Sequence, residues 1–330
     1  MKTLFPGYYC QNESECESFW KDCLFVLDAN VLLDIYRYSQ RSASELLDVL
    51  EKVKDRLWLP YQVAKEYHNN LYDTIKDQAA TYNTAIKKID DLKQLIAVQR
   101  RHPFLPECDL DRFSGFCDEF MKKLGEQHDK IHSLLLKNQY KDRLADLLNG
   151  RINVAPSEEK LEELREKGRH RYEKKIPPGY KDADKSGDGM YGDFILWSEV
   201  KEYAKQNKKD VIFVTNDQKE DWFLRVSGLT LCARPELIAE FQKDTAQKIY
   251  ICNLKRFMDN LKKYIKVSIT QTVVDEIQEQ QQIKQDEKTE AGGDELNFSR
   301  GETGTLQPPQ SSQDNVILPQ QDDITSANNS

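Results

Sequence analysis

The stretch that most constrains the fold is residues 24–34, which read LFVLDANVLLD. The aliphatic run 24–27 is too short for a surface helix and predicts a strand buried on both faces, as in a parallel sheet. After Asp28 the apolar residues recur at helical spacing, so a carboxylate lies where a buried strand ends and a helix begins. In open α/β sheets, ligands bind at that edge, outside the carboxyl ends of the strands.

A second stretch, residues 211–217 (VIFVTND), repeats this design and ends in Asp217. Further strands are predicted over residues 56–59, 228–234 and 248–252, with amphipathic helices between them. Strands that alternate with helices favour an α/β fold with a central parallel sheet covered by helices on both faces.

Residues 70–176 interrupt this alternation. Their apolar residues step by three or four in near-heptad order, break at residues 102–106 (HPFLP), resume, and stop at Gly150, after which a charged helix follows. The pattern predicts a long helical-hairpin insertion with coiled-coil character inside an α/β domain of residues 1–270. The apolar stripe serves either as the hairpin's own seam or as a surface for a protein partner or for self-association.

Charge is distributed unevenly. The formal charge is −8, but residues 271–330 contain 12 acidic and 3 basic side chains, which leaves the body with a net charge of +1. The acidic balance therefore belongs to the end of the chain and does not exclude a polyanionic partner for the body. Residues 271–330 lack the apolar residues of a core and predict a disordered acidic tail, with a short helix at its start as an open alternative.

The seven cysteines contain no CxxC pair, which argues against a zinc ribbon or a disulfide frame. The sequence shows neither a signal peptide nor an apolar run of membrane-spanning length. We therefore expect a soluble cytoplasmic protein.

Acidic side chains recur where the sheet edge could gather them. Asp28 and Asp217 end buried strands, Glu66 lies in the helix after the second predicted strand, and Asp193 opens the helix before residues 211–214, while Asp221 follows Asp217 by four residues. Carboxylates brought together repel unless a cation neutralises them, and hard oxygen ligands select Mg²⁺ or Mn²⁺. Such ions stabilise the charge that builds on a phosphate during hydrolysis, so the set predicts metal-dependent cleavage of phosphodiester bonds.

Each of these residues also has an ordinary structural interpretation. Asp28 and Asp217 fit turns at strand ends, Asp193 fits a helix N-cap, and Asp221 fits an ion pair with Arg225 four residues later. Their common location is the argument for a site.

Several longer motifs then carry a resemblance. The segments FVLDANVLLDIYRYS, WLPYQVAKEYHNN, IPPGYKDADK, YGDFILWSEV and FVTNDQKEDWF resemble those of the PIN-domain nucleases, in particular their large PIN-like prokaryotic subgroup. The joint occurrence of YGDxxxW and VTNDxKEDW is specific. The resemblance implies a three-layer α/β/α fold, an acidic pocket at the carboxyl ends of the strands, and Mg²⁺- or Mn²⁺-dependent nuclease activity, usually on RNA and in some branches on DNA.

Residue by residue, the resemblance implies that Asp28, Glu66, Asp193 and Asp217 are catalytic metal ligands with Asp221 as a supporting acid. It also implies that two polar side chains orient these ligands through hydrogen bonds, namely Asn30 and Thr215. The family often has a basic residue after the EYH element, where this chain has residues 69–70 (NN).

Three further residues are candidates for substrate binding. Lys219 follows Asp217 by two positions, and Lys181 and Tyr180 lie in a lysine-rich loop that could contact a phosphate backbone and stack a base. The alternative for the loop is a solvated segment whose lysines are neutralised by Asp182 and neighbouring acids.

The sequence thus predicts a PIN-like, divalent-metal-dependent hydrolase that cleaves RNA. A structure-specific DNA nuclease and a non-catalytic PIN-like binding module are the alternatives. The prokaryotic setting of the family implies a role in growth arrest or antiviral defence.

Overall fold

The computed structural model describes residues 1, 6–9, 13–97, 105–185, 187–226 and 229–293. Residues 102–104 of the predicted break between the hairpin helices, and residues 294–330 of the predicted tail, lie outside the described residues. The chain divides into two units, residues 1–284 and residues 285–330. The following description concerns the first unit.

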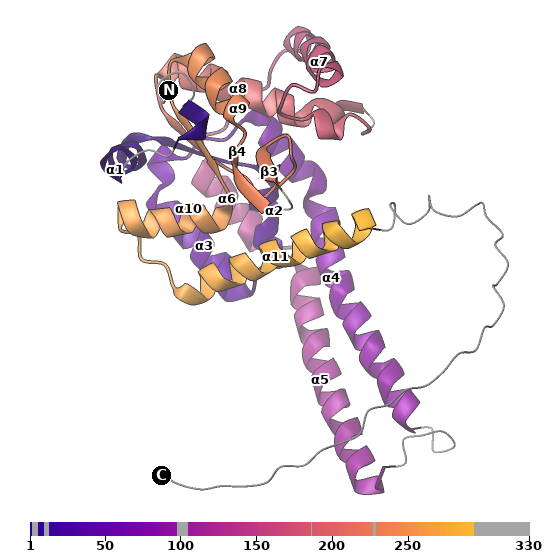
Figure 1. The fold of residues 1–330 in the computed structure, drawn as a ribbon. Helices are drawn as coiled ribbons and strands as arrows, with labels where there is room; N and C mark the ends of the chain where they lie inside the picture. The colour runs from indigo at the N-terminus through magenta and orange to yellow at the C-terminus, as the bar shows by residue number, and fades with distance from the viewer. Residues whose placement is uncertain (2–5, 10–12, 98–104, 186, 227–228, 294–330) are drawn as a thin grey trace, which may run out of the picture. The chain divides into compact units, whose positions relative to one another are not determined.

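A three-stranded parallel sheet forms the centre of the fold (Figure 1). Its strands are β1 (Leu24–Leu27), β2 (Val211–Val214) and β5 (Ile249–Cys252), in the spatial order β1-β2-β5. The register pairs Leu27 with Val214 and Val214 with Cys252, so the strands end at one common edge. Every side chain of β2 is buried, as expected for a strand covered on both faces. The predicted α/β fold with a central parallel sheet is confirmed.

Helices cover both faces of the sheet, because neighbouring residues of a strand point to opposite sides. Phe25 lies on the face of α1 (Glu13–Asp22) and α10 (Leu254–Asn260), with its ring centroid 5.2 Å from that of Phe257. Phe213 points to the opposite face, where its ring centroid lies 5.1 Å from that of Trp222. Trp222 packs in turn on Trp197 of α8 (Gly192–Asn207). The fold therefore has three layers, α/β/α.

The other helical elements of this unit connect these layers. They are η1 (Pro6–Tyr8), α2 (Ala29–Asp34), η2 (Ile35–Arg37), α3 (Gln40–Lys52), η3 (Lys54–Arg56), α6 (Gln139–Leu148), α7 (Glu158–Glu173), η4 (Tyr180–Asp182), η5 (Gly187–Tyr191), α9 (Pro235–Thr245) and the π-helical turn η6 (Leu261–Ile265).

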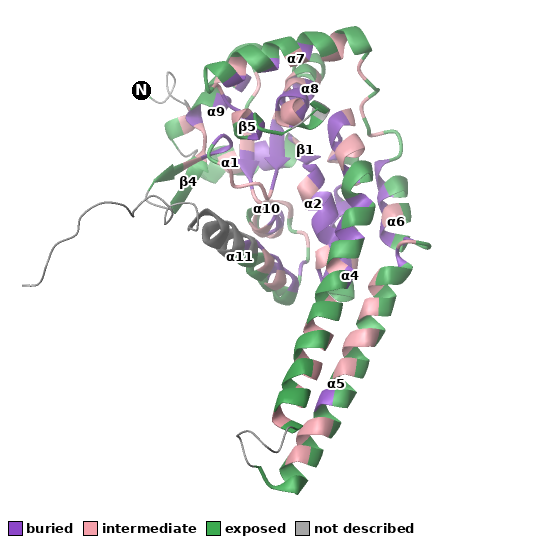
Figure 2. Ribbon diagram, turned by 90° about the vertical axis from the view of Figure 1, so that its right-hand side faces the viewer, coloured by how far each residue is buried: buried purple, intermediate pink, exposed green. Residues whose placement is uncertain are grey.

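The predicted helical hairpin is present as α4 (Tyr61–Ala97) and α5 (Glu107–Ser133), which lie side by side in both ribbon views (Figures 1 and 2). The helix that carries Glu66 and the first hairpin helix are one continuous helix. Its buried side chains end at Ala79, so the first half of α4 belongs to the core. The second half forms, with α5, an arm whose side chains are largely exposed (Figure 2).

The strand predicted over residues 56–59 does not form. Leu57 bridges to Phe25 and Leu59 bridges to Ile152, but each contact is isolated. Between them, Trp58 turns toward α8 and stacks on Tyr203, with the two ring centroids 3.9 Å apart. The two leucines therefore have different neighbours, and no ladder extends past a single pair.

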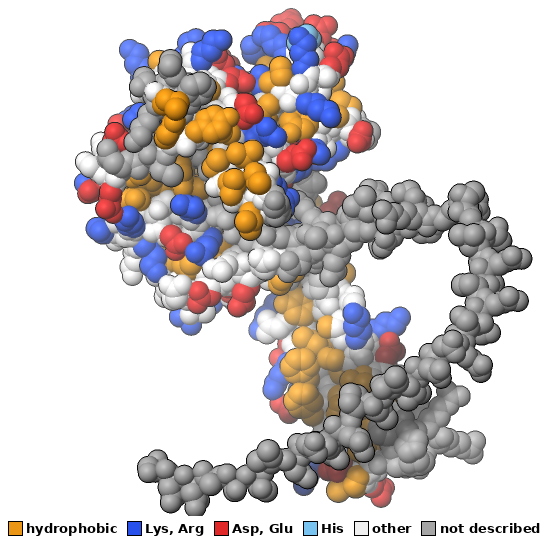
Figure 3. Space-filling view, viewed as in Figure 1, with side chains coloured by type: hydrophobic (Ala, Val, Ile, Leu, Met, Phe, Trp, Pro, Cys, Tyr) orange, Lys and Arg blue, Asp and Glu red, His pale blue; other side chains and the backbone are white. Residues whose placement is uncertain are grey.

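The strand predicted over residues 228–234 forms as β4 (Leu229–Ala233), but it pairs antiparallel with β3 (Phe223–Val226) rather than joining the central sheet. Val226, Leu229 and Leu231 of this hairpin are exposed, and Figure 3 shows hydrophobic side chains gathered there.

Helix α11 (Gln271–Gly293) begins where the tail was predicted. Val273, Val274 and Ile277 are buried in the main core, and the Glu276 carboxylate accepts a hydrogen bond from the Ser39 hydroxyl at 2.8 Å. The predicted domain boundary after residue 270 is thus too early, because the first three turns of α11 belong to the folded body.

Within the described ranges, no helix has both the length and the apolar character needed to cross a membrane. Among the described cysteines, Cys23, Cys108, Cys117 and Cys252 have free thiols.

Candidate active site

A pocket of about 520 Å³ opens at the carboxyl edge of the sheet, and five carboxylates line it. Asp28 directly follows β1 and Asp217 follows β2, so the register of these strands brings the two residues to the same edge. Asp193 is the second residue of α8, Glu66 lies in the second turn of α4, and Asp182 ends η4. The four acidic residues predicted as the core of the site therefore meet in one pocket, although they span 190 positions of the chain.

Contacts between helices position two of these acids relative to each other. The buried Glu199 of α8 accepts hydrogen bonds from the backbone N–H of Tyr61 at 2.7 Å and of Gln62 at 3.0 Å, and so satisfies the first free donors of α4. Glu66 is one turn further along α4, and Asp193 lies six residues before Glu199. One buried carboxylate thereby fixes both helices that carry site residues.

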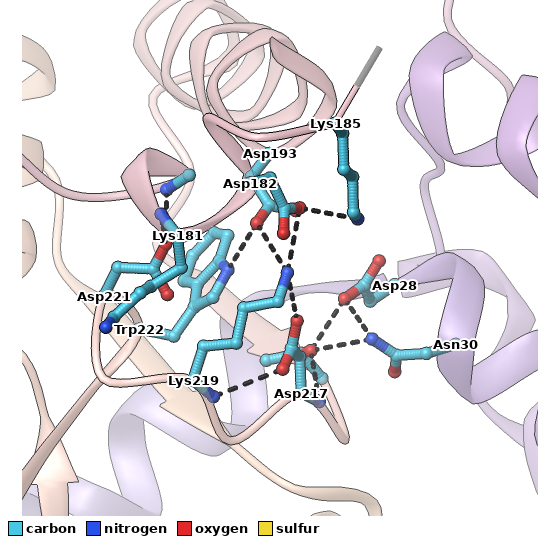
Figure 4. A network of polar contacts seen from close by, with 12 residues as sticks. Asp28, Asn30, Lys181, Asp182, Lys185, Asp193, Asp217, Lys219, Asp221 and Trp222 are labelled. Atoms are coloured by element: carbon cyan, nitrogen blue, oxygen red, sulfur yellow. Dashed lines mark hydrogen bonds and ion pairs between the residues drawn. The ribbon is translucent and has the colours of Figure 1, made fainter. Parts of the chain in front are cut away.

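Asp28 is held by three donors. Its Oδ1 accepts from the Ala29 backbone N–H at 2.6 Å, and its Oδ2 accepts from the Thr215 hydroxyl and the Asn30 amide, both at 2.6 Å (Figure 4). Asn30 is oriented in turn, since its Oδ1 accepts from the Asn216 backbone N–H at 2.9 Å. Asn30 and Thr215 thus lie where the sequence analysis expected them, in contact with the first acid.

The hydrogen-bond network that orients Asp28 continues through Asn216 to helix α11. The Asn216 side chain accepts a hydrogen bond from the Gln281 amide at 2.7 Å and from the Leu254 backbone N–H at 3.0 Å. Its amide nitrogen donates to Asp34 at 2.8 Å. The residue that precedes Asp217 is therefore fixed by three separate helical segments.

The pocket raises the pKa values of its acids. Burial, reinforced by the charges of Glu66, Asp193 and Asp217, raises the pKa of Asp28 to about 8, against the opposing hydrogen bond from Thr215. Burial also raises the pKa of Asp193 to about 7, despite the nearby Lys219, and it raises the pKa of Glu66 despite the hydrogen bond from Gln62. These carboxylates are short of positive charge, as in a site built to receive a cation.

Lys219 lies among the acids. Its Nζ is 2.9 Å from Asp182 Oδ2, 2.9 Å from Asp217 Oδ2 and 3.5 Å from Asp193 Oδ2 (Figure 4). Burial favours the neutral amine, but the carboxylates of Asp193 and Asp217 outweigh it and raise the pKa of Lys219 above its ordinary value. The lysine is therefore charged at all physiological pH values. Asp193 Oδ2 also accepts from the Trp222 indole N–H at 3.3 Å.

Asp182 is a site residue that the sequence analysis missed as such. Its buried carboxylate accepts from Lys185 at 2.8 Å as well as from Lys219. The interpretation of Asp182 as a partner of loop lysines describes its contacts, but it does not reveal that the loop folds into the pocket. The sequence feature that could have identified Asp182 as a site residue is its place in the IPPGYKDADK motif.

Three residues predicted for the site lie outside the pocket. Asp221 Oδ2 accepts from the backbone N–H groups of Gly179 at 2.9 Å and Lys181 at 3.2 Å, so it holds the loop (Figure 4). The Lys181 ammonium pairs with Glu220 at 2.7 Å, and the Tyr180 hydroxyl accepts from an arginine. The family resemblance implied that Asp221 is a supporting acid of the site, and here its carboxylate contacts the loop backbone instead of lining the pocket.

The lining fits a hard cation in its chemistry. The five carboxylates face three lysines, Lys65, Lys185 and Lys219, which leaves a formal charge of −2, and amide oxygens are available from Asn69 and Asn70. Oxygen donors without sulfur or imidazole suit Mg²⁺ or Mn²⁺. In the arrangement seen here, no three acidic, histidine or cysteine side chains of the described residues are close enough to hold a metal ion.

The fold and the pocket together define a class, namely α/β domains that gather buried acids at the carboxyl edge of a parallel sheet. Within that class the chain belongs to the family of PIN-like domains, whose family model matches residues 24–237. The match begins with β1, includes the α4–α5 hairpin and covers every residue that lines the pocket. No curated protein and no solved structure matches the chain.

Proposed function

We propose that this protein is a divalent-metal-dependent nuclease that hydrolyses phosphodiester bonds in RNA. The observation that carries the proposal is the convergence of Asp28, Glu66, Asp193 and Asp217, from four separate segments, on one buried pocket with excess negative charge. Clustered carboxylates destabilise a fold unless cations join them, and the three lysines of the lining leave a formal charge of −2 among the five acids. Membership of the PIN-like family agrees with nuclease activity.

The four acids are the proposed holders of Mg²⁺ or Mn²⁺. The ion, when bound, supplies positive charge that neutralises the carboxylates and stabilises the phosphate group under attack. The contribution of the chain is to fix these acids in place. Thr215 and Asn30 hold the Asp28 carboxylate in one orientation, and the hydrogen bond from Gln62 to Glu66 Oε1, at 2.6 Å, does the same for Glu66.

RNA is the proposed substrate on the strength of the family resemblance, and structure-specific cleavage of DNA is the enzymatic alternative. A different alternative is a non-catalytic binding module. One observation favours it: a lysine ammonium lies among the acids where an active metalloenzyme would be expected to keep room for a cation.

The test is cleavage of labelled single- and double-stranded RNA and DNA in the presence of Mg²⁺, Mn²⁺ or EDTA. We expect RNA cleavage that EDTA abolishes and that Asp28→Asn and Asp217→Asn each reduce by roughly 100-fold or more, since loss of even an outer support of a metal ligand costs roughly 10–100-fold. Asp184→Asn is the matched control, because this exposed aspartate lies outside the pocket. Binding of nucleic acid without cleavage under either metal would reject the nuclease in favour of the binding module.

We also propose that the α4–α5 arm is an interaction surface for a second copy of the chain or another protein. Leu92 and Leu95 on α4, and Phe116 and Phe120 on α5, are between 43% and 64% exposed. The two phenylalanine rings stack on each other, with centroids 5.8 Å apart. A two-helix arm buries only part of its apolar stripe, whereas a four-helix bundle would bury the remainder.

A further inference from the structure

The contacts of Lys219 divide the pocket into two halves. In one half, its ammonium contacts carboxylate oxygens of Asp182, Asp193 and Asp217, which come from three separate segments. Its side chain is 23% exposed, so it is largely removed from solvent. An ammonium in this position acts as a built-in counter-cation rather than as a surface charge.

The other half contains Asp28 and Glu66, and the hydrogen bonds to these acids come from neutral donors. Asp28 accepts from a backbone N–H, a hydroxyl and an amide, and Glu66 accepts from the Gln62 amide. A lysine ion pair is thus described for each acid of the first half, and the charges of Lys185 and Lys219 also act at longer range on Glu66, where they lower its pKa.

The spacing of the lysine half suits an ammonium group. Oxygen atoms 2.9 Å from Nζ are at normal distances for charge-assisted hydrogen bonds, whereas Mg²⁺ requires oxygens at about 2.0–2.1 Å. Asp217 is also held at both oxygens by the same residue, because the Lys219 backbone N–H donates to its Oδ1 at 3.2 Å and the ammonium contacts its Oδ2. A metal ion could use Asp217 only by displacing both contacts.

We propose that Lys219 takes the place of a second cation, so that the protein binds a single divalent ion in the half of the pocket bounded by Asp28 and Glu66. Asp193 borders both halves, since its Oδ2 accepts from Lys219 and its charge helps to raise the pKa of Asp28. Asp217 then holds the lysine, which narrows the proposed holders of the ion from four acids to Asp28, Glu66 and Asp193. This inference rests on the proposed metal-dependent function and specifies the number of ions that it uses.

The direct test counts bound ions by titrating Mn²⁺ into the full chain, with calorimetry for stoichiometry and electron paramagnetic resonance for the environment of the ion. We expect one ion for the wild type and for Lys219→Arg, and two ions for Lys219→Met, in which the ammonium among Asp182, Asp193 and Asp217 is removed. Lys181→Met is the matched control, because this lysine pairs with Glu220 outside the pocket, and it should bind one ion.

A second pair of variants keeps the proposal testable if Lys219→Met does not fold. Glu66→Gln should weaken Mn²⁺ binding at least tenfold, whereas Asp182→Asn, in the lysine half, should leave the affinity within about twofold of the wild type. Two ions of similar affinity in the wild type, one ion in a folded Lys219→Met, or equal losses in Glu66→Gln and Asp182→Asn would each overturn the proposal. A wild type that binds no ion and cleaves no nucleic acid would instead overturn the proposed function.

Discussion

In the absence of metal ions, replacement of the first acid by its neutral isostere should stabilise the folded protein at alkaline pH. Asp28 is 7% exposed and lies beside other acids, so burial raises its pKa to about 8. The folded state therefore binds a proton that the unfolded chain, with the ordinary pKa of 3.8, has already released. Stability contributed by this group is complete below the unfolded pKa and is lost as the pH rises from 3.8 toward 8.

The slope of this loss is about 1.4 kcal/mol per pH unit for one proton, which gives a cost of about 5 kcal/mol at pH 8 and about 2 kcal/mol at pH 5. Asp28→Asn removes that cost but turns an amide toward Thr215 and Asn30, which both donate to Oδ2. Two lost hydrogen bonds subtract about 3 kcal/mol. The net effect is a gain of about 2 kcal/mol at pH 8 and a loss of about 1 kcal/mol at pH 5.

Thermal unfolding in EDTA at these two pH values measures the effect. At about 2–4 °C per kcal/mol for a body of this size, we expect Asp28→Asn to raise Tm by about 5 °C at pH 8 and to lower it by about 3 °C at pH 5. Asp184→Asn, which replaces an exposed aspartate, should change Tm by less than about 1 °C at either pH. A difference between Asp28→Asn and wild type that does not vary with pH would refute the claim that Asp28 is protonated in the metal-free fold.

Two further changes test the pocket and the arm. An added Cβ at Gly192 would lie 2.5 Å from Glu66 Oε1, so Gly192→Ala should weaken Mn²⁺ binding in a titration by roughly tenfold while the helix is retained. The control is Gly115→Ala, because an added Cβ there meets open space on α5. Equal Mn²⁺ affinities for the two variants would contradict this account of Glu66. Sedimentation should show a self-associated wild type and a monomeric Phe116→Ser/Phe120→Ser double variant, whereas a monomeric wild type would remove self-association from the proposal for the arm.

The sheet edge could be predicted from the sequence because two runs of four buried residues each end close to an aspartate. Parallel pairing of Leu27 with Val214 then requires Asp28 and Asp217 to be neighbours, whatever the intervening chain does. The prediction of Glu66 and Asp193 as site residues depended on motifs rather than on periodicity, because the sequence around an acid on a helix does not show in which direction its side chain points. Their meeting in one pocket follows from the packing of α4 on α8, which the sequence pattern does not specify.

The mispredicted elements share a physical cause, which is that tertiary contacts decided between local alternatives. Residues 229–233 have the composition of a strand but no signal for its partner, and the adjacent Phe223–Val226 segment took that place. Asp221 was assigned from the family motif, and the irregular chain after β2 turns its carboxylate to the loop instead. Residues 271–283 have few apolar side chains, but Val273, Val274 and Ile277 fall on one helical face and suffice to dock α11.

The long insertion between Glu66 and Asp193 does not weaken the site, because the two acids are fixed relative to each other before the insertion begins and after it ends. Glu199 binds the first N–H groups of α4 directly, and the buried side chains of α4 continue only to Ala79. Beyond that point the arm contributes no side chain to the pocket. The proposed partner surface and the proposed metal site therefore lie on different parts of one helix, and a change in the distal arm should alter partner binding without altering metal binding.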